Sequence, residues 1–307
     1  MSRKAIAGKS VAGKLTTAKP TIAIIGAGSL GSFLAVALEA AGFTITEIVA
    51  RDSPRSRQSA RSLAAKVGAK AVTVRPAALD ATVLWLCVPD GAIRGAASDL
   101  ADRLFARGAQ QGSALRFAFH SSGALSSREL EPLRKAGIVV ASVHPLMTFV
   151  RGARPSLTGV PFAIEGDSAA KRVARRIVRA LGGESFSLPA ARKAAYHAWA
   201  TLTSPLFLAF LVTLEEAARA AGLTRQEARR KILPIIQQTL ANYSHLGSAR
   251  SFSGPLIRGD AKTVANHLAA LKKNPGAREV YVALARAALR GLPVKNRDGL
   301  QRLLRNP

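Results

Sequence analysis

Cysteine is nearly absent from this sequence, since Cys87 is the only one among 307 residues. A single cysteine forms no intrachain disulfide and excludes a zinc site built from several cysteines. We therefore expect a reducing, cytoplasmic location and a fold that depends on its apolar core. The apolar fraction of 48% is high enough to exclude disorder by composition, and the chain length predicts two domains.

Acidic residues are also scarce: 18 Asp and Glu stand against 45 Lys and Arg, which gives a net charge of +27. Such a surface attracts anionic substrates and polyanions alike. However, the two tryptophans, three tyrosines and eleven phenylalanines are too few for a base-stacking platform, and no nucleic-acid-binding motif concentrates the charge. We expect no specific nucleic-acid partner. Binding of nucleic acid through the basic surface is the lesser alternative, and it predicts affinity that falls steeply with salt.

A long, uninterrupted apolar run is missing as well. Residues 194–214 come closest, but they include His197, Ser204 and Pro205, so we expect a buried helix and no membrane span. Residues 1–19 carry five basic residues, no acid and no apolar segment of the signal-peptide kind. We interpret them as a flexible basic tail, with an organelle transit peptide as the alternative.

Up to residue 189, short apolar runs alternate with amphipathic stretches, which predicts an α/β domain over residues 20–189. The expected strands are residues 21–25, 44–50, 71–74, 83–88, 115–119, 138–143 and 160–164. The expected helices are residues 29–41, 54–67, 92–107 and 169–181. This alternation is typical of a doubly wound, mainly parallel Rossmann sheet with helices on both faces.

After residue 189 the strand pattern stops, and an all-α C-terminal domain is expected over residues 190–307. Thr224 and Glu227 have the spacing of a capping box, and Pro205 predicts a kink in the first helix. The helical patterns cover residues 190–221, 224–246, 260–271 and 277–289.

The clearest motif is Gly26-Ala27-Gly28-Ser29-Leu30-Gly31, a G-x-G-x-x-G between a predicted strand and a predicted helix. In a dinucleotide site Gly26 permits the tight turn, Gly28 lets the backbone approach the pyrophosphate, and Gly31 allows close packing of helix on strand. Ser29 and Leu30 then begin the helix whose N-terminus meets the phosphates. The alternative is a tight strand-to-helix turn that binds nothing.

The end of the second predicted strand indicates which dinucleotide is bound. Arg51 lies 20 residues after Gly31, with Ser53 and Arg55 close by, and arginine there accommodates the 2′-phosphate of NADP. Asp52 is the counter-argument, because an acid at this place binds the ribose hydroxyl of NAD. We expect Asp52 to pair with an arginine or to cap the next helix, so NADP is the predicted cofactor.

Two further strand exits supply candidate residues. Val88 and Pro89 follow the fourth strand and are expected to touch the dinucleotide, whereas Asp90 is expected to cap a helix and Cys87 to lie in the core. Ser121 and Ser122 follow the fifth strand and are placed near the nicotinamide.

Histidines supply the candidate chemistry. His120 and His144 lie at strand exits, and Lys193, Tyr196 and His197 share one helical face. The predicted catalytic residues are His120, Lys193 and His197, which would polarise a carbonyl or imine and move a proton, and His144 and Tyr196 are predicted to bind substrate. No metal-ligand spacing is present, so we expect no metal.

Several motifs in order carry a family resemblance over about residues 20–290. They are residues 26–31, Val88-Pro89-Asp90, His120 to Leu125, His144 to Phe149, Phe162 to Asp167, Lys193 with Tyr196-His197, Gly254 to Asp260, and residues 264–268. On these motifs the chain resembles bacterial proteins that pair a Rossmann-like domain with a C-terminal domain of unknown function. Those proteins are similar in build to pyrroline-5-carboxylate reductase and to deazaflavin-dependent NADP oxidoreductases, with a helical domain like the C-terminal one of 6-phosphogluconate dehydrogenase.

The resemblance implies an NADP-linked dehydrogenase or reductase that forms a homodimer through its helical domain. We expect a small carbonyl, imine or hydroxy-acid substrate between the two domains. Family members usually continue the Lys-x-x-Tyr-His helix into a Ser-Asn pair, whereas Ser204 and Pro205 stand here, which removes an amide from the expected substrate site. Arg258 is either an anion-binding residue for the substrate or part of a turn before a cap at Asp260. The alternative function is a non-catalytic sensor of NADP or a metabolite on the same fold.

Overall fold

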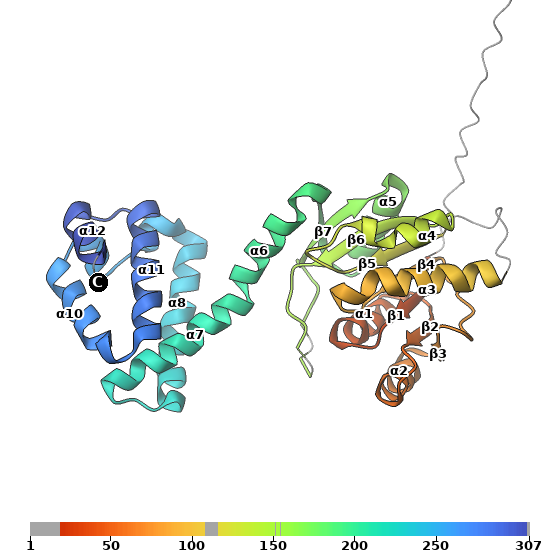
Figure 1. Cartoon of the computed structure of the whole chain (residues 1–307), viewed down its shortest axis with the longest axis horizontal. Helices are drawn as coiled ribbons and strands as arrows, with labels where there is room; N and C mark the ends of the chain where they lie inside the picture. The colour runs from red at the N-terminus through yellow and green to blue at the C-terminus, as the bar shows by residue number, and fades with distance from the viewer. Residues whose placement is uncertain (1–18, 108–115, 151, 154, 306–307) are drawn as a thin grey trace, which may run out of the picture. The chain divides into compact units, whose positions relative to one another are not determined.

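The computed structural model describes residues 19–107, 116–150, 152–153 and 155–305. The predicted basic tail therefore lies outside the described residues, except for Lys19, whose ammonium donates a hydrogen bond to the carbonyl of Ala41. The chain divides into two compact units, residues 1–200 and 201–307 (Figure 1). The predicted domain boundary after residue 189 falls shortly before this division.

The first unit contains an eight-stranded sheet. Its strands are β1 (Ile22–Ile25), β2 (Ile45–Ala50), β3 (Lys70–Thr73), β4 (Val83–Leu86), β5 (Phe117–His120), β6 (Val139–Pro145), β7 (Pro161–Gly166) and β8 (Glu184–Ser187). The order across the sheet is β3-β2-β1-β4-β5-β6-β7-β8, and β6 and β7 form the antiparallel pair in it. The seven expected strands are all present, in the mainly parallel arrangement that the alternation predicts. β8 was missed because its four residues, Glu-Ser-Phe-Ser, are exposed at the sheet edge and carry no apolar run.

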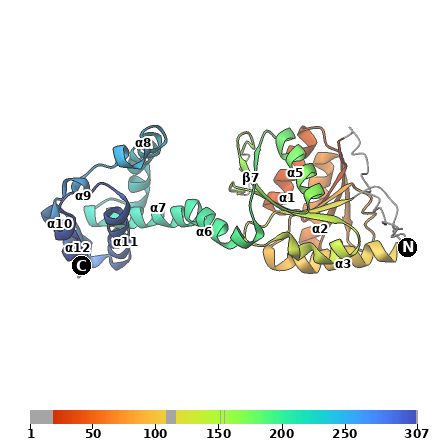
Figure 2. The ribbon, with the colours of Figure 1, turned by 90° about the horizontal axis from the view of Figure 1, so that it is seen from above.

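Helices cover both faces of this sheet. The helices of the first unit are α1 (Ser29–Ala40), α2 (Pro54–Val67), α3 (Ile93–Ala106), α4 (Glu131–Lys135) and α5 (Ser168–Ala180). Apolar residues of α1, α2 and α5 pack on one face, and those of α3 and α4 pack on the other. Figure 2 shows α1 and α5 on one side of the sheet and α3 on the opposite side. Burial on both faces explains why β1 and β4 are uninterrupted apolar runs.

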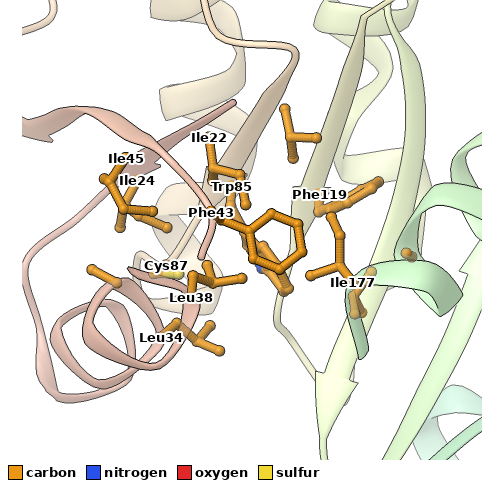
Figure 3. Close-up of a cluster of buried hydrophobic side chains, with 14 of the residues drawn as sticks. Ile22, Ile24, Leu34, Leu38, Phe43, Ile45, Trp85, Cys87, Phe119 and Ile177 are labelled. Carbon is orange, nitrogen blue, oxygen red and sulfur yellow. The ribbon is translucent and has the colours of Figure 1, made fainter. Parts of the chain in front are cut away.

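Large aromatic side chains fill the core on the α1 face (Figure 3). Trp85 and Phe119 from adjacent strands meet edge to face, with ring centroids 5.5 Å apart. Cys87 lies in the same cluster, and burial raises the pKa of its thiol to about 12. This confirms that Cys87 is a core residue, because a nucleophilic cysteine needs an accessible thiolate.

The remaining chain is helical, as expected. Its helices are α6 (Lys193–Thr203), α7 (Pro205–Ala218), α8 (Arg225–Ser251), α9 (Pro255–Arg258), α10 (Ala261–Ala270), α11 (Pro275–Gly291) and α12 (Arg297–Arg305). Short 3-10 turns are η1 (Asp90–Ala92), η2 (Ser127–Leu130), η3 (Ala190–Arg192), η4 (Arg219–Ala221) and η5 (Leu271–Lys273). The Thr224–Glu227 capping box forms at the start of α8, and α6 ends just before Pro205, where a kink was predicted. The core of the second unit is formed by α10, α11 and α12.

The prediction that residues 194–214 form a buried helix is wrong for the single chain. Leu202 of α6 is 63% exposed and Leu208 of α7 is 62% exposed. By length and composition alone, the helical stretch Ala190–Ala221 is long and apolar enough to cross a membrane, and its most apolar window is not buried within the chain. The core of the second unit is formed by α10, α11 and α12 instead. An apolar sequence therefore does not by itself show that a helix is buried.

Candidate active site

The glycine motif forms the predicted strand-to-helix turn. Gly26 follows β1 with a φ of +107°, and a Cβ on it would lie 2.6 Å from the carbonyl oxygen of Cys87. A Cβ on Gly31 would collide with the carbonyl oxygen of Gly26, whereas the space beside Gly28 is open. Gly28 precedes α1 and provides no side-chain cap, so the N-terminal amides of α1 are available for an anion. The turn therefore has the cradle shape that a pyrophosphate requires.

The end of β2 presents exposed arginines. Arg51 and Arg55 are exposed and form no ion pair with another described residue, whereas Arg57 lies 3.1 Å from the carboxylate of Asp52. Ser53 caps α2 by accepting a hydrogen bond from the amide of Ser56. Asp52 thus pairs with an arginine, which is one of its two expected roles. The other expected role, capping α2, belongs to Ser53.

A polar loop follows β5. The Ser122 hydroxyl accepts hydrogen bonds from the amides of Ala124 and Leu125 and donates one to the carboxylate of Asp90, 2.9 Å away. Asp90 begins η1 and makes no cap there, so its expected role as an N-cap is wrong. Its carboxylate instead ties the exit of β4 to the loop after β5. The hydroxyl of Ser121 is held by the indole N–H of the buried Trp85.

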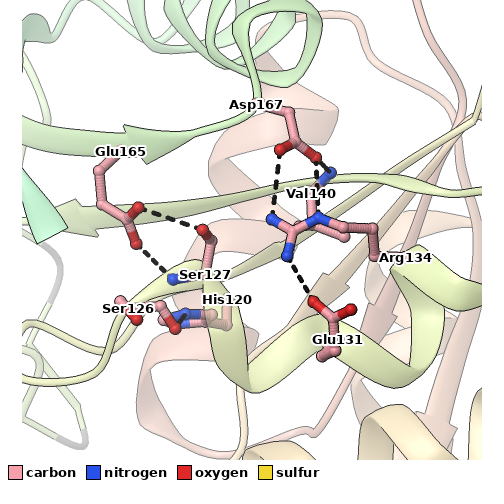
Figure 4. A network of polar contacts seen from close by, with 8 residues as sticks. All are labelled: His120, Ser126, Ser127, Glu131, Arg134, Val140, Glu165 and Asp167. Carbon is pink, nitrogen blue, oxygen red and sulfur yellow. Dashed lines mark hydrogen bonds and ion pairs between the residues drawn. The ribbon is translucent and has the colours of Figure 1, made fainter.

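His120 is fully buried at the end of β5, and both of its ring nitrogens are bonded to backbone. Figure 4 shows the contact to Ser126. Nδ1 accepts from the amide of Ser122, so Nε2 carries the proton and donates to the carbonyl oxygen of Ser126. Burial lowers the pKa of His120 to about 4, which keeps the ring neutral. The geometry therefore assigns His120 to holding the loop, because neither nitrogen is free to exchange a proton with a substrate.

Lys193, the first residue of α6, inserts its side chain among these groups and is 2% exposed. Its ammonium donates to the carbonyl oxygen of Ser122 at 2.8 Å and to the hydroxyl of Ser142 at 2.5 Å. Burial lowers the pKa of Lys193 to about 8, against the opposing effect of Glu165 and Asp90. An amine with a pKa close to neutrality can both hold and release a proton.

His144, Tyr196 and His197 form the second half of the cluster. Nδ1 of His144 lies 2.8 Å from the Tyr196 hydroxyl, and the centroids of the two imidazole rings are 6.3 Å apart. Burial lowers the pKa of His144 to about 4 and raises that of Tyr196 to about 12, so both are neutral at pH 7. Gly123 provides the space for the imidazoles, since a Cβ there would lie 2.7 Å from the His197 ring and 2.8 Å from Nε2 of His144.

The structure thus brings together most of the predicted catalytic and substrate residues at the exits of β5 and β6. Arg258 is not among them, since it belongs to the second unit, where it ends α9. Asp260 caps α10 by accepting from the amide of Thr263, which is the turn-and-cap arrangement that we kept as an alternative. Among the residues that the structure describes, no group of three His, Cys, Asp or Glu side chains could hold a metal ion.

Sequence analysis missed Ser142 and Glu165 and misjudged Asp90. Ser142 lies between Ala141 and Val143 in β6, and Glu165 follows Ile164 in β7, so apolar neighbours surround both in the sequence. A polar residue on a buried strand is a signal in itself, because such a group is kept only when it is hydrogen-bonded. This signal marks the two positions as hydrogen-bonded, but it does not identify the groups that they contact.

The mainly parallel sheet, the glycine turn and the polar cluster at the strand exits define a Rossmann-like domain of the dinucleotide-binding type. Family models agree, since a Rossmann-like domain matches residues 6–145 and the domain of unknown function DUF2520 matches residues 160–288. The chain belongs to the proteins that join these two domains. No curated protein sequence matches it.

Solved structures share this fold over most of their length. Protein BF3122 from Bacteroides fragilis is 22% identical, with a TM-score of 0.69 over 88% of this chain and 97% of that one. Protein TM1727 from Thermotoga maritima is 24% identical, with a TM-score of 0.66 over 93% and 98%. The imine reductase from Myxococcus stipitatus in complex with NADP+ is 17% identical, with a TM-score of 0.63 over 88% and 94%. At these identities the likeness establishes the fold.

Proposed function

We propose that the protein is an NADP-dependent oxidoreductase that acts on a small carbonyl, imine or hydroxy-acid substrate. The observation that carries this proposal is the position of the Lys193, His144 and His197 cluster. It lies at the exits of β5 and β6, on the same edge of the sheet as the glycine turn after β1. Ligands of doubly wound sheets bind at this edge.

The cofactor assignment depends on two features. The open space at Gly28 and the uncapped start of α1 suit a pyrophosphate. Arg51 and Arg55, which are exposed and form no ion pair within the described part of the chain, suit a 2′-phosphate. The imine reductase of the same fold, solved with NADP+, supports this assignment. Val88, Pro89, Ser121 and Ser122 would then lie near the nicotinamide.

NADP(H), when bound, supplies or accepts the hydride. In the reductive direction the hydride forms a C–H bond at the carbonyl or imine carbon, and a proton must reach the oxygen or nitrogen. We assign polarisation of that atom to the Lys193 ammonium and delivery of the proton to Lys193 or His197. His144 and Tyr196, both neutral, would bind the substrate by hydrogen bonds.

The first test is titration calorimetry with NADPH and, separately, NADH, at moderate salt to screen nonspecific attraction by the +27 charge. We expect NADPH to bind at least about tenfold more tightly, equivalent to about 1.4 kcal/mol. The double variant Arg51→Ala, Arg55→Ala should abolish this preference. Lys66→Ala, which removes a cation near the other end of α2, is the matched control and should leave the preference unchanged.

Turnover is then followed by NADPH oxidation across a carbonyl, imine and 2-hydroxy-acid panel. Lys193→Met and His197→Ala should each lower turnover by about 100-fold while NADPH still binds. Stoichiometric NADPH binding without any turnover would favour the sensor function. Failure to bind either dinucleotide would refute the oxidoreductase proposal.

We also propose that two copies of the chain pair through the apolar residues that α7 and α8 leave exposed. This exposed apolar set consists of Leu206, Phe207, Leu208, Val212, Leu233, Ile235, Leu240, Tyr243 and Leu246. Soluble monomers rarely expose so many large apolar side chains on two packed helices, which supports an interface.

A further inference from the structure

The ammonium of Lys193 is held by two neutral oxygen atoms. Ser142, which is fully buried on β6, donates its only hydroxyl proton to the carbonyl oxygen of Ser122 at 3.2 Å. It must therefore accept the hydrogen bond from Lys193 and cannot donate one in return. Lys193, Ser142 and Ser122 thus form a closed triangle in which the direction of every hydrogen bond is fixed.

Glu165 lies directly across from Ser142 on the antiparallel neighbour strand β7. It is only 9% exposed, and its carboxylate accepts hydrogen bonds from the amide and the hydroxyl of Ser127 (Figure 4). It forms no ion pair within 4 Å among the described residues, but it is the carboxylate that most raises the pKa of Lys193. Glu165 therefore balances the buried ammonium without touching it.

The other titratable groups around Lys193 contribute less charge. Asp90, after β4, also raises the pKa of Lys193, but its carboxylate is exposed and hydrogen-bonded to Ser122. His120 on β5 and His144 on β6 are neutral above a pH of about 4, and the phenol of Tyr196 on α6 is neutral at pH 7. His197, also on α6, lies beside His144 and Gly123.

We propose that Ser142 and Glu165 are positioning residues for Lys193: they keep its amino group charged and leave its third N–H, which has no hydrogen-bond partner among the described residues, to the substrate. The inference rests on the proposed function, because it requires that Lys193 donates a hydrogen bond to the substrate. An ammonium has three N–H groups, and the carbonyl of Ser122 and the hydroxyl of Ser142 take two of them. The tetrahedral nitrogen then fixes the direction of the third.

The test measures Lys193 directly and needs no substrate. Lysine side chains labelled with 13C at Cε are titrated by NMR in the full chain, and the Lys193 signal is assigned by its loss in Lys193→Arg. We expect Ser142→Ala and Glu165→Gln each to lower the pKa of Lys193 by about one unit, because each removes a group that stabilises the ammonium. Ser142→Thr keeps the hydroxyl and should restore the original value.

Glu47→Gln is the matched control. Glu47 is also a buried carboxylate that accepts two loop amides, those of Ala78 and Leu79, but it lies on β2 and does not affect Lys193. An unchanged pKa in both Glu165→Gln and a folded Ser142→Ala would overturn the inference. Equal shifts in Ser142→Ala and Ser142→Thr would overturn the role of the hydroxyl.

The activity readout separates this inference from the proposed function. Once a substrate is identified, the pH profile of turnover should move with the pKa of Lys193 in the same variants. A shifted pKa with a stationary pH profile would overturn the catalytic part of the inference. Shifted pKa values in a protein that reduces nothing would instead count against the proposed function, while the contacts to Lys193 would stand.

Discussion

At the scale of single residues, Gly123 determines how closely the imidazoles of His144 and His197 approach the exit of β5. Its φ is ordinary, so an alanine is acceptable to the backbone, but the added Cβ would meet both rings at less than 3 Å. The glycine is therefore required by the site and not by the turn. A glycine that is required only by neighbouring side chains indicates a functional site. A glycine with a positive φ is required by the backbone conformation and gives no such indication.

We predict that Gly123→Ala lowers turnover at least about tenfold, because the imidazoles must move and small displacements of reacting groups are costly. NADPH affinity should change less than about twofold, since the glycine turn after β1 is not touched. Steady-state kinetics and calorimetry on the same preparation check both expectations. Gly95→Ala in α3, where an added Cβ meets nothing within 4 Å, is the control and should leave turnover unchanged. Full activity in Gly123→Ala would remove the imidazole pair from the proposed site.

At the scale of secondary-structure elements, His120 fastens the end of β5 to the loop that follows it. Its pKa is lowered from 6.5 to about 4 by burial, so between these values the unfolded chain binds a proton that the folded chain does not. Stability in this window therefore rises with pH and is lost as the pH falls from 6.5 towards 4. His144, with a pKa lowered to about 4 in the same way, adds to the effect.

We predict that the free energy of unfolding falls by about 2 kcal/mol or more between pH 7 and pH 5, as measured by urea denaturation. His120→Phe should be less stable at pH 7, because the amide of Ser122 and the carbonyl of Ser126 lose their partner, and its pH dependence should be shallower. His245→Gln, at an exposed histidine of α8, should keep the full slope. An unchanged slope in His120→Phe would show that other groups cause the acid sensitivity.

The elements also show what sequence could and could not predict. Seven strands and the main helices of the first unit were predictable, because each buries an apolar run or stripe whose period is visible in the sequence. β8 and α12 were not, since β8 is exposed and α12 is rich in arginine. In the site, Lys193, His144 and His197 were predictable from motif and helix spacing. Their partners were not: Ser142 and Glu165 come from strands that become neighbours only through the antiparallel pairing of β6 and β7.

At the scale of the whole molecule, the exposed apolar set of α7 and α8 bears on assembly. We predict a mass of about twice 32.2 kDa by light scattering at micromolar concentration. Leu208→Asp combined with Ile235→Asp should give monomers that remain folded, because these side chains are 62% and 65% exposed in the single chain. Phe105→Asp changes a residue of α3 that is 63% exposed in the first unit, and it should leave the dimer intact.

A different result would redirect the interpretation of this surface. A monomeric protein that binds phosphatidylcholine–phosphatidylglycerol vesicles through α7 would contradict the dimer and would give the apolar stretch Ala190–Ala221 a membrane role. A dimer that survives both aspartates would place the interface elsewhere. Each outcome is read from the same light-scattering and vesicle-flotation experiments.

The isolation of Cys87 has a practical consequence for such experiments. The only thiol of the chain is buried in the core, and its pKa of about 12 leaves almost no thiolate at the pH of maleimide chemistry. The unmodified protein therefore should not react with thiol-specific labels. A cysteine introduced at any exposed position will be the one reactive thiol. Fluorophores or spin labels can then be placed one at a time on either unit without replacing Cys87 first.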